Sequence, residues 1–273
     1  MIYYFSGTHN SRYAALRLGS MTGEEVRFIP DINPYEEIFD AAKDKSVGFV
    51  FPVYAWGVPP IVMNFITRLP EKIVSCIKNS GTNVWCVATC GDETGMAVRM
   101  LAEGIEKRGL TLSGAWSLIM PNVYVLLPGF GIDPKQIEEE KLENSITRLH
   151  HIAECINTRQ LEEDVHLGSL PRLKTSMIYP LFTRWGVNTK KWHYTDTCTG
   201  CGKCAMTCPV GNITITDGHP KWGNDCTSCC ACYHICPANS AQYGKITSGM
   251  GQYFNNFELR SRDDENVKKH IFH

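Results

Sequence analysis

The sequence lacks the features of several large classes of protein. Its 27 basic and 28 acidic side chains nearly cancel over 273 residues, so there is no basic field to attract nucleic acid or acidic lipid. No apolar run approaches the roughly 20 residues that a membrane-spanning helix needs. The opening residues, MIYYFSG, lack the basic-then-apolar plan of a signal peptide. We therefore expect a cytoplasmic protein with no membrane span and no nucleic-acid partner.

Cysteine, in contrast, is abundant, with 13 in the chain. Nine of these fall between residues 198 and 236. Cysteines scattered through a small secreted chain would suggest disulfides, but this clustering favours a reducing compartment. The other four, Cys76, Cys86, Cys90 and Cys155, are widely spaced. Three are expected to be small buried apolar residues, and Cys90 lies in a loop considered below.

The stretch from Cys198 to Pro237 contains one motif twice. CTGCGKCAMTCP and CTSCCACYHICP both read C-x2-C-x2-C-x3-C-P, the bacterial iron–sulfur pattern in which the fourth cysteine serves the other cluster. Three closely spaced thiolates wrap one face of a compact cluster, and the fourth arrives from elsewhere in the fold. The pattern predicts two 4Fe–4S clusters. The expected ligands are Cys198, Cys201, Cys204 and Cys236 for one cluster, and Cys226, Cys229, Cys232 and Cys208 for the other.

Zinc and disulfides explain the same cysteines less well. Zinc sites usually pair two C-x2-C knuckles or add histidine, whereas these eight cysteines form two identical runs. Disulfides would require an oxidising compartment, for which nothing else in the chain argues. Cys230 lies between two expected ligands and is not expected to bind a cluster.

The first 165 residues alternate between strand and helix patterns. Short apolar runs rich in strand formers alternate with segments that carry apolar residues at helical spacing. The expected strands are 2–5, 26–29, 47–53, 83–89 and 112–120, and the expected helices include 35–44, 61–69, 98–105 and 134–163. Such alternation predicts an α/β domain with a doubly wound, five-stranded parallel sheet.

Ligands of such sheets bind beyond the carboxyl ends of the strands, where three loops must gather. The loop at residues 6–11 offers hydroxyl groups, amides and backbone N–H groups at a helix N-terminus, which favour an anion. It has no lysine, no G-x4-G-K and no G-x-G-x-x-G, so neither a nucleoside triphosphate nor a dinucleotide is expected. The single phosphate of FMN suits it better. A plain helix N-cap is the structural alternative.

FSGTHNS, PVYAWGVPP, TCGDETG and the doubled cysteine motif together resemble bacterial flavodoxin–ferredoxin fusion proteins, over nearly all of residues 1–245. The resemblance implies a flavodoxin-like FMN-binding domain (1–165), a packed connecting segment (166–189), a small α+β two-cluster ferredoxin-like domain (190–246) and a C-terminal tail (247–273). The implied FMN-site residues are Ser6, Thr8, His9, Asn10 and Ser11 at the phosphate, with Tyr54, Ala55, Trp56 and Gly57 on one side of the ring and Thr89, Cys90, Gly91 and Gly95 on the other. We expect the first part of the tail to pack on the ferredoxin-like domain.

Several of these residues have a simpler structural interpretation. His9 stands where the family usually has a second glycine, and it is strained if the backbone there needs a positive φ. Tyr54 and Trp56 either stack on the ring or pack their loop onto the next helix. Cys90 has no neighbouring lysine or arginine, so we expect a space-filling residue rather than a nucleophile. No catalytic residue stands out.

These patterns lead to an electron-transfer flavo-iron–sulfur protein that passes electrons between two 4Fe–4S clusters and FMN. Its expected partner is a redox protein or a small electron acceptor. A homodimer is compatible with the sequence. Two alternatives remain at this point. One is an FMN-dependent reductase of a small substrate such as a quinone. The other is an iron–sulfur sensor or assembly protein whose flavodoxin-like fold does not bind FMN. The sequence leaves open whether the chain is a carrier or an enzyme.

Overall fold

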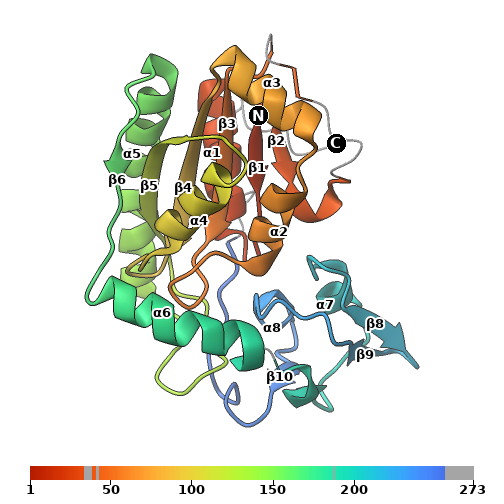
Figure 1. The fold of residues 1–273 in the computed structure, drawn as a ribbon. Helices are drawn as coiled ribbons and strands as arrows, with labels where there is room; N and C mark the ends of the chain where they lie inside the picture. Colours follow the sequence, from red (N-terminus) through yellow and green to blue (C-terminus); the bar gives the residue numbers. More distant parts are fainter. Residues whose placement is uncertain (34–38, 41–42, 187, 256–273) are drawn as a thin grey trace.

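A six-stranded parallel sheet organises the N-terminal part of the chain (Figure 1). The computed structural model describes residues 1–33, 39–40, 43–186 and 188–255. The strands are β1 (Ile2–Tyr4), β2 (Val26–Phe28), β3 (Ser46–Pro52), β4 (Asn83–Cys90), β5 (Leu112–Ile119) and β6 (Glu163–Asp164). Their order is β2-β1-β3-β4-β5-β6, and the first five follow the flavodoxin-type order. The predicted flavodoxin-like α/β fold is confirmed.

All five expected strands are present, each within about two residues of its expected bounds. The sixth strand, β6, extends the sheet beside β5. It has only two residues, both exposed and charged, so it lacks the run of apolar residues by which a strand is recognised in a sequence.

Helices cover both faces of the sheet. They are α1 (Asn10–Thr22), α2 (Pro60–Arg68), α3 (Glu71–Ser80), α4 (Ala97–Glu106) and α5 (Lys135–Thr158). Alternate residues of β1 point to opposite faces: Ile2 and Tyr4 join the core beneath α1 and α5, and Tyr3 joins the core beneath α2, α3 and α4. The helix expected over residues 35–44 lies mostly outside the described residues. None of the helices in the described part of the chain is long and apolar enough to cross a membrane.

The cysteine-rich part of the chain forms a second, smaller lobe below the sheet (Figure 1). It contains two antiparallel strand pairs and two short helices, so the predicted α+β arrangement is confirmed. The pairs are β7 (Trp192–Tyr194) with β10 (Ala241–Tyr243), and β8 (Ile213–Thr216) with β9 (His219–Trp222); the helices are α7 (Lys203–Met206) and α8 (Ala231–His234). Asp217 and Gly218 both have positive φ, as a two-residue hairpin turn of type I′ requires.

The connection between β5 and α5 ties the two lobes together. Val125 and Leu126 from this connection are buried in the core of the smaller lobe, against Trp192, Tyr233 and Tyr243. The Nε2 atom of His234 donates to the carbonyl oxygen of Val123 at 2.7 Å. A loop of the larger lobe therefore completes the hydrophobic core of the smaller one.

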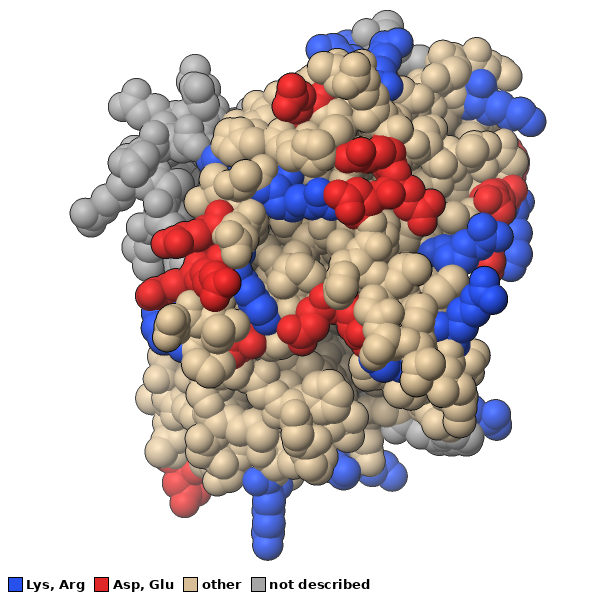
Figure 2. Space-filling view, turned by 90° about the vertical axis from the view of Figure 1, so that its left-hand side faces the viewer, with Lys and Arg blue, Asp and Glu red and all other residues tan. Residues whose placement is uncertain are grey.

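Helix α6 (Pro171–Leu181) crosses the junction between the lobes (Figure 1). Its inner side contacts the loop after β3: the Tyr179 hydroxyl donates to the Val58 carbonyl at 2.6 Å, and the Thr175 hydroxyl donates to the Trp56 carbonyl at 2.8 Å. Leu173 and Met177 lie on its exposed side. Figure 2 views the molecule from the left-hand side of Figure 1, where α5, β6 and the start of α6 lie; acidic and basic side chains crowd the upper part of this side, whereas the lower part carries few charges. Three short helical turns complete the fold: Ile29–Asp31, Phe182–Gly186 and Thr189–Lys191.

Candidate functional site

A cavity of about 730 Å³ lies between the carboxyl ends of the central strands and the smaller lobe. Its volume falls in the range of small-molecule and cofactor sites. Nine of the residues expected at an FMN site line it: Ser6, Thr8, Asn10, Ser11, Tyr54, Ala55, Trp56, Thr89 and Cys90. The fold thus brings together the loops that follow β1, β3 and β4, which is where ligands of doubly wound sheets bind.

The loop at residues 6–11 leads directly into the N-terminus of α1. Asn10 and Ser11 are buried and already hold protein partners: the Asn10 side-chain amide donates to the Pro121 carbonyl at 3.0 Å, and the Ser11 and Thr89 hydroxyls lie 2.7 Å apart. These bonds fix the shape of the loop. The hydroxyls of Ser6 and Thr8 and the backbone N–H groups at the start of α1 are the donors best placed for an anion.

His9 has the strained backbone that its position in the loop suggested. Its φ is +71°, in the left-handed region, which costs a non-glycine residue about 1–2 kcal/mol. Its ring packs edge-on against Phe254, with centroids 4.3 Å apart. Burial, assisted by the nearby Arg12 charge, lowers the pKa of His9 to about 4, so the ring is neutral near pH 7. A glycine at this position could not make the contact with Phe254.

The tail reaches this loop as well as the smaller lobe. The Gln252 side chain donates to the carbonyl oxygens of Tyr233 and Cys236, as expected for a tail that packs on the cysteine-rich part. The next residues continue to the larger lobe. The Tyr253 hydroxyl donates to Oδ1 of Asn10 at 2.9 Å, and the Asn255 N–H donates to the Thr8 carbonyl at 3.1 Å. The expectation for the tail was therefore incomplete.

Ala55 and Trp56 form a tight turn at the edge of the cavity. Tyr54 and Gly57 exchange both backbone hydrogen bonds at 2.9 Å, and the two residues between them have φ of +48° and +61°. This is the geometry of a type I′ turn, which glycine and asparagine usually supply. Contacts with α6 and with the loop after β4 stabilise the strained turn.

Glu93 is the central residue of those contacts. Its carboxylate accepts from Trp56 Nε1 at 2.6 Å and from the Ser169 N–H at 3.0 Å, and it forms an ion pair with Lys174. Burial alone would raise the pKa of Glu93, but the hydrogen bonds from Lys174, Trp56 and Ser169 outweigh it and keep that pKa below the usual value. The ionised carboxylate fixes the Trp56 indole at the cavity wall.

Four of the expected residues lie behind the cavity rather than in its lining. His9 faces the tail. Each of the three glycines allows a close approach: a Cβ atom at Gly57 would lie 2.3 Å from the Tyr179 ring, at Gly91 1.7 Å from Oδ1 of Asn122, and at Gly95 2.5 Å from Cβ of Trp56. These glycines shape the loops and offer no side chain to a ligand.

Sequence reasoning missed about half of the cavity wall. The missed residues come from the connection after β5, from α6 and the turn after it, and from the cysteine motif. They include Met120, Tyr124, Leu127, Phe130, Ile178, Phe182, Ser228, Cys229 and Cys230. The switch-point rule for doubly wound sheets could have drawn attention to the connection after β5. No local pattern marks the other segments.

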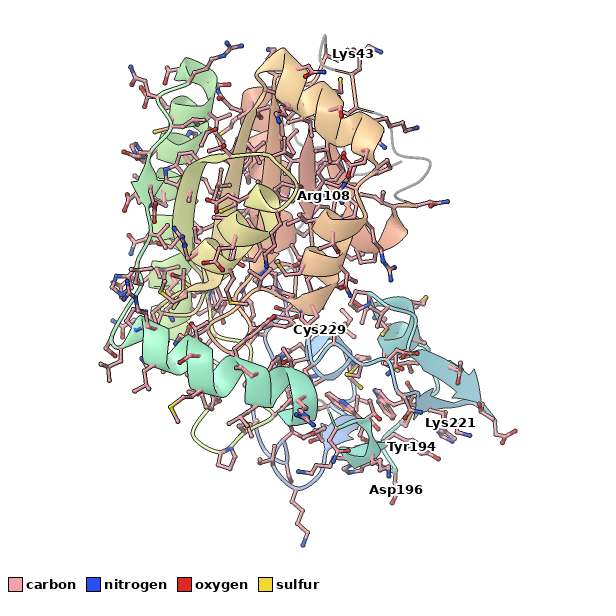
Figure 3. The ribbon with its side chains drawn as sticks, in the orientation of Figure 1. Lys43, Arg108, Tyr194, Asp196, Lys221 and Cys229 are labelled. Carbon is pink, nitrogen blue, oxygen red and sulfur yellow. The ribbon has the colours of Figure 1, made fainter. Side chains whose placement is uncertain are left out.

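The cysteines expected to hold the first cluster come together at the outer edge of the smaller lobe. Cys198, Cys201, Cys204 and Cys236 line one small cavity, next to Tyr194. Cys201 is exposed, and the backbone N–H of Lys203 lowers the pKa of its thiol. We call this set the outer site. Figure 3 shows Tyr194, Asp196 and Lys221 at this edge, away from the sheet.

The cysteines expected to hold the second cluster lie close to one another under the cavity. Cys226 and Cys229 lie near Cys208 and near each other, and Cys232 lies near Cys229 and Cys226. We call this set the inner site. Burial is the main reason why the pKa of the Cys229 thiol is raised to about 12, so this thiol needs a metal to become a thiolate.

Unpaired polar atoms around the inner site fit a bound cluster. The Tyr54 hydroxyl is buried without a hydrogen-bond partner and lies next to Cys229 and Cys226. The Thr227 hydroxyl and the Trp222 indole N–H are also buried without a well-formed hydrogen bond, and they face the sulfurs of Cys229 and Cys232. Buried donors are normally satisfied, and cluster sulfurs would be suitable acceptors. The residues present therefore fit an iron–sulfur group.

Cys229 also lies where the two lobes meet (Figure 3). It lines the large cavity together with the loop at residues 6–11. A Cβ atom at Gly7 would lie 2.6 Å from Cβ of Cys229 and 2.8 Å from its carbonyl oxygen. An expected cluster ligand is thus in direct contact with the expected phosphate loop.

A family model described as a 4Fe-4S binding domain matches residues 192–214, which include the first cysteine run. The chain therefore carries a 4Fe–4S binding domain. No curated protein sequence matches the chain.

Several solved structures are similar at low identity. Rubredoxin oxygen:oxidoreductase from the anaerobe Desulfovibrio gigas is 13% identical with a TM-score of 0.38, over 58% of this chain and 36% of that protein. The Trp repressor binding protein from Bacillus subtilis is 15% identical with a TM-score of 0.36, over 57% of this chain and 94% of that one. Azoreductase AzrA is 10% identical with a TM-score of 0.36, over 57% and 99% respectively. The fold assignment rests on the strand order rather than on these likenesses.

Proposed function

We propose that the chain is an electron-transfer flavo-iron–sulfur protein with two 4Fe–4S clusters and FMN. The observation that carries this proposal is the position of Cys229, which lines the large cavity and packs against Gly7 of the phosphate loop. A cluster at the inner site would border the same cavity as the flavin. Electron transfer between them would then need no diffusive docking step.

The order of the centres follows from burial. The inner site borders the large cavity through Cys229, whereas no cysteine of the outer site lines that cavity and Cys201 is exposed. Met206, the last residue of α7 and two residues after Cys204, is 77% exposed. An external redox partner would therefore exchange electrons at the outer site, and the inner site would connect it to the cavity.

The chain's own residues would hold the FMN at two places. Ser6, Thr8 and the backbone N–H groups before α1 would bind the phosphate, with Asn10 and Ser11 keeping the loop in shape. Trp56, held by Glu93, and Cys90 border the opposite parts of the wall. When bound, a flavin supplies the exchange between two-electron and one-electron chemistry.

Anaerobic purification followed by iron, zinc and flavin analysis tests this proposal. We expect flavin absorption bands, released FMN, and iron equivalent to two 4Fe–4S clusters per chain. Iron without flavin would favour the alternative of a sensor or assembly protein with a flavin-free fold. Zinc in place of iron, or no metal, would overturn the proposal.

A reductase of a small apolar substrate is the second candidate, because one end of the cavity is apolar. Leu127 and Phe130 are 48% and 46% exposed at this end, and Ile178, Leu181 and Phe182 complete it. Such a surface suits a quinone-like ring. Turnover of a quinone panel by the purified protein, with Leu127→Asp as the matched variant, separates an enzyme from a carrier.

A further inference from the structure

A second cluster of metal-ligating side chains lies on the larger lobe, on the sheet edge formed by α5 and β6. His151, Cys155 and Glu162 place one ligand atom each within 4.8 Å of the others. None of them belongs to the cavity or to the cysteine motif. From this geometry we propose a divalent-metal site of the zinc class, with the ligands His151, Cys155 and Glu162.

The backbone brings these three residues together. His151 and Cys155 are four residues apart on α5, so their side chains lie one above the other on one helix face. Helix α5 ends at Arg159, which has left-handed backbone, and the chain then turns back. The carbonyl oxygen of Glu162 accepts from the Ala115 N–H at 2.8 Å, which fixes Glu162 at the sheet edge and directs its side chain back to α5.

The spacing of the ligand atoms is close to that around zinc. Sγ of Cys155 lies 3.7 Å from Nε2 of His151 and 3.8 Å from Oε1 of Glu162. Tetrahedral zinc has bonds of about 2.3 Å to sulfur and about 2.0–2.2 Å to nitrogen or oxygen, which separates its ligands by about 3.4–3.6 Å. Nε2 of His151 and Oε1 of Glu162 are closer, at 2.8 Å, because a hydrogen bond joins them. Metal binding would replace this hydrogen bond and lengthen the distance between Nε2 of His151 and Oε1 of Glu162.

The surroundings suit a metal in two further ways. The indole N–H of the buried Trp116 lies 3.4 Å from Oε1 of Glu162, and such outer contacts orient metal-ligating carboxylates. Cys155 is buried beneath the other two, whereas the His151 and Glu162 side chains are about half exposed, at 48% and 46%. The side open to solvent leaves room for a water as fourth ligand.

The ligand types select the metal class. A thiolate, an imidazole and a carboxylate favour zinc over magnesium or calcium, which prefer oxygen ligands alone. Binding would deprotonate the Cys155 thiol and release that proton to solvent. The thiolate and carboxylate charges would then balance the divalent cation. Without a metal, His151 and Glu162 share a hydrogen bond above a buried thiol.

The site connects to the cavity through β6. After Glu162 the chain passes through β6 to residues 166 and 167, whose carbonyl oxygens accept from the N–H groups of Thr94 and Gly95. Those residues belong to the loop after β4 at the cavity wall. A metal at this site would therefore fix α5 to the strand that supports the loop.

The test uses the anaerobically purified protein with its clusters loaded, so that the motif cysteines do not bind zinc. Zinc titration by calorimetry should show one saturable site per chain, and anomalous scattering at the zinc edge should place the ion between the three ligands. His151→Ala should abolish saturable binding, and Glu162→Gln should weaken it at least tenfold. His151 is exposed, so its replacement is not expected to affect folding.

His150→Ala and Glu163→Gln are the matched controls, because the first removes a neighbouring imidazole and the second a neighbouring carboxylate charge, and both leave the three ligands in place. Both should bind zinc as the wild type does. Equal zinc binding by wild type and His151→Ala, or no saturable binding by the wild type, would overturn the proposal. Iron content and flavin content are expected to be unchanged in all four variants, so failure of this site is distinguishable from failure of the proposed function.

Discussion

The two halves of the cysteine motif have the same backbone in different surroundings. Each position of the second run lies 28 residues after its equivalent in the first, since Cys226 corresponds to Cys198. Gly200 and Gly202 have positive φ, and so do their equivalents Ser228 and Cys230. Asn212 and Ser240, also 28 residues apart, donate their N–H groups to Sγ of Cys208 and Cys236 at 3.3 and 3.2 Å.

The difference between the halves lies in the side chains at those left-handed positions. The outer half has glycine, which tolerates positive φ, and it faces solvent. The inner half has Ser228 and Cys230, which are buried and line the large cavity. The repeat therefore accepts backbone strain where a side chain contacts the larger lobe. One copy has been adapted to the interface and the other to the surface.

The largest expected effect separates the two sites by removing one ligand from each. Cys229→Ala and Cys201→Ala should each lose half of the iron. Cys229→Ala should also stop an external donor from reducing the flavin through the clusters, because the inner site is the one beside the cavity. Cys201→Ala should slow reduction without changing flavin affinity. Stopped-flow absorbance measures the rate of flavin reduction, and chemical analysis measures the iron and flavin contents of each variant. Equal rates of flavin reduction in Cys229→Ala and Cys201→Ala would contradict the proposed order, in which the inner site lies next to the flavin.

The next effect concerns the contact between the lobes. Gly7→Ala would place a Cβ atom 2.6 Å from Cβ of Cys229, so the loop at residues 6–11 and the inner site would have to separate. We expect a loss of about 1–3 kcal/mol in the free energy of unfolding and weaker FMN binding. Gly131→Ala is the control, since no atom lies within 4 Å of its added Cβ and no positive φ is required. Equal melting temperatures for the two variants would show that the contact carries no strain.

Exchanging the residue types of the two halves should give a smaller effect. An added Cβ at Gly202 meets nothing within 4 Å, so Gly202→Ala should cost only the backbone term of about 1 kcal/mol. Cys230→Gly should relieve a similar amount of backbone strain but should also lose the stabilisation from the buried cysteine side chain. Its net change in unfolding free energy should therefore be close to zero. FMN affinity is the discriminating measurement: it should fall for Cys230→Gly alone.

Much of this comparison was accessible from the sequence, because its signals are local. The apolar runs marked β1 to β5 to within about two residues, and the cysteine spacing predicted the 4Fe–4S binding domain. The strand order of the sheet then placed three loops at one edge, as the switch-point rule requires.

The remainder depends on contacts between distant segments. Nothing near Val125 and Leu126 indicates that they are buried in the core of the other lobe, and nothing near Tyr253 indicates that its hydroxyl reaches Asn10. The turn at Ala55 and Trp56 was hidden for a different reason: neither residue type is typical of positive φ. Tertiary contacts, including the hydrogen bonds of Glu93 and Thr175, determine that conformation.

His9 extends the comparison to the phosphate loop, since it too combines positive φ with a side-chain contact. His9→Gly should relieve about 1 kcal/mol of backbone strain and lose a ring contact of about 0.5–1.5 kcal/mol, so the two effects should nearly cancel. In a Phe254→Ala background the same change should stabilise the protein. Denaturant unfolding of the wild type, the two single variants and the double variant measures the coupling energy between His9 and Phe254. Leu173→Ala, on the exposed side of α6, should be additive with His9→Gly.

The smallest effect is the pH dependence that His9 contributes. Its pKa is lowered from 6.5 to about 4 by burial and by Arg12, so between these values the unfolded chain binds a proton that the folded protein excludes. Stability should therefore fall as the pH drops through this window, by roughly 1 kcal/mol between about pH 7 and about pH 5 after allowance for solvent near the ring. His9→Asn keeps a residue that tolerates left-handed backbone but does not titrate. Subtracting the stability of His9→Asn from that of the wild type at each pH, both taken from melting curves, removes the contribution of the other titrating groups. If the difference does not change with pH, the His9 ring has the same pKa in the folded and unfolded states. The ring is then exposed in the folded protein, and its packing against Phe254 does not persist in solution.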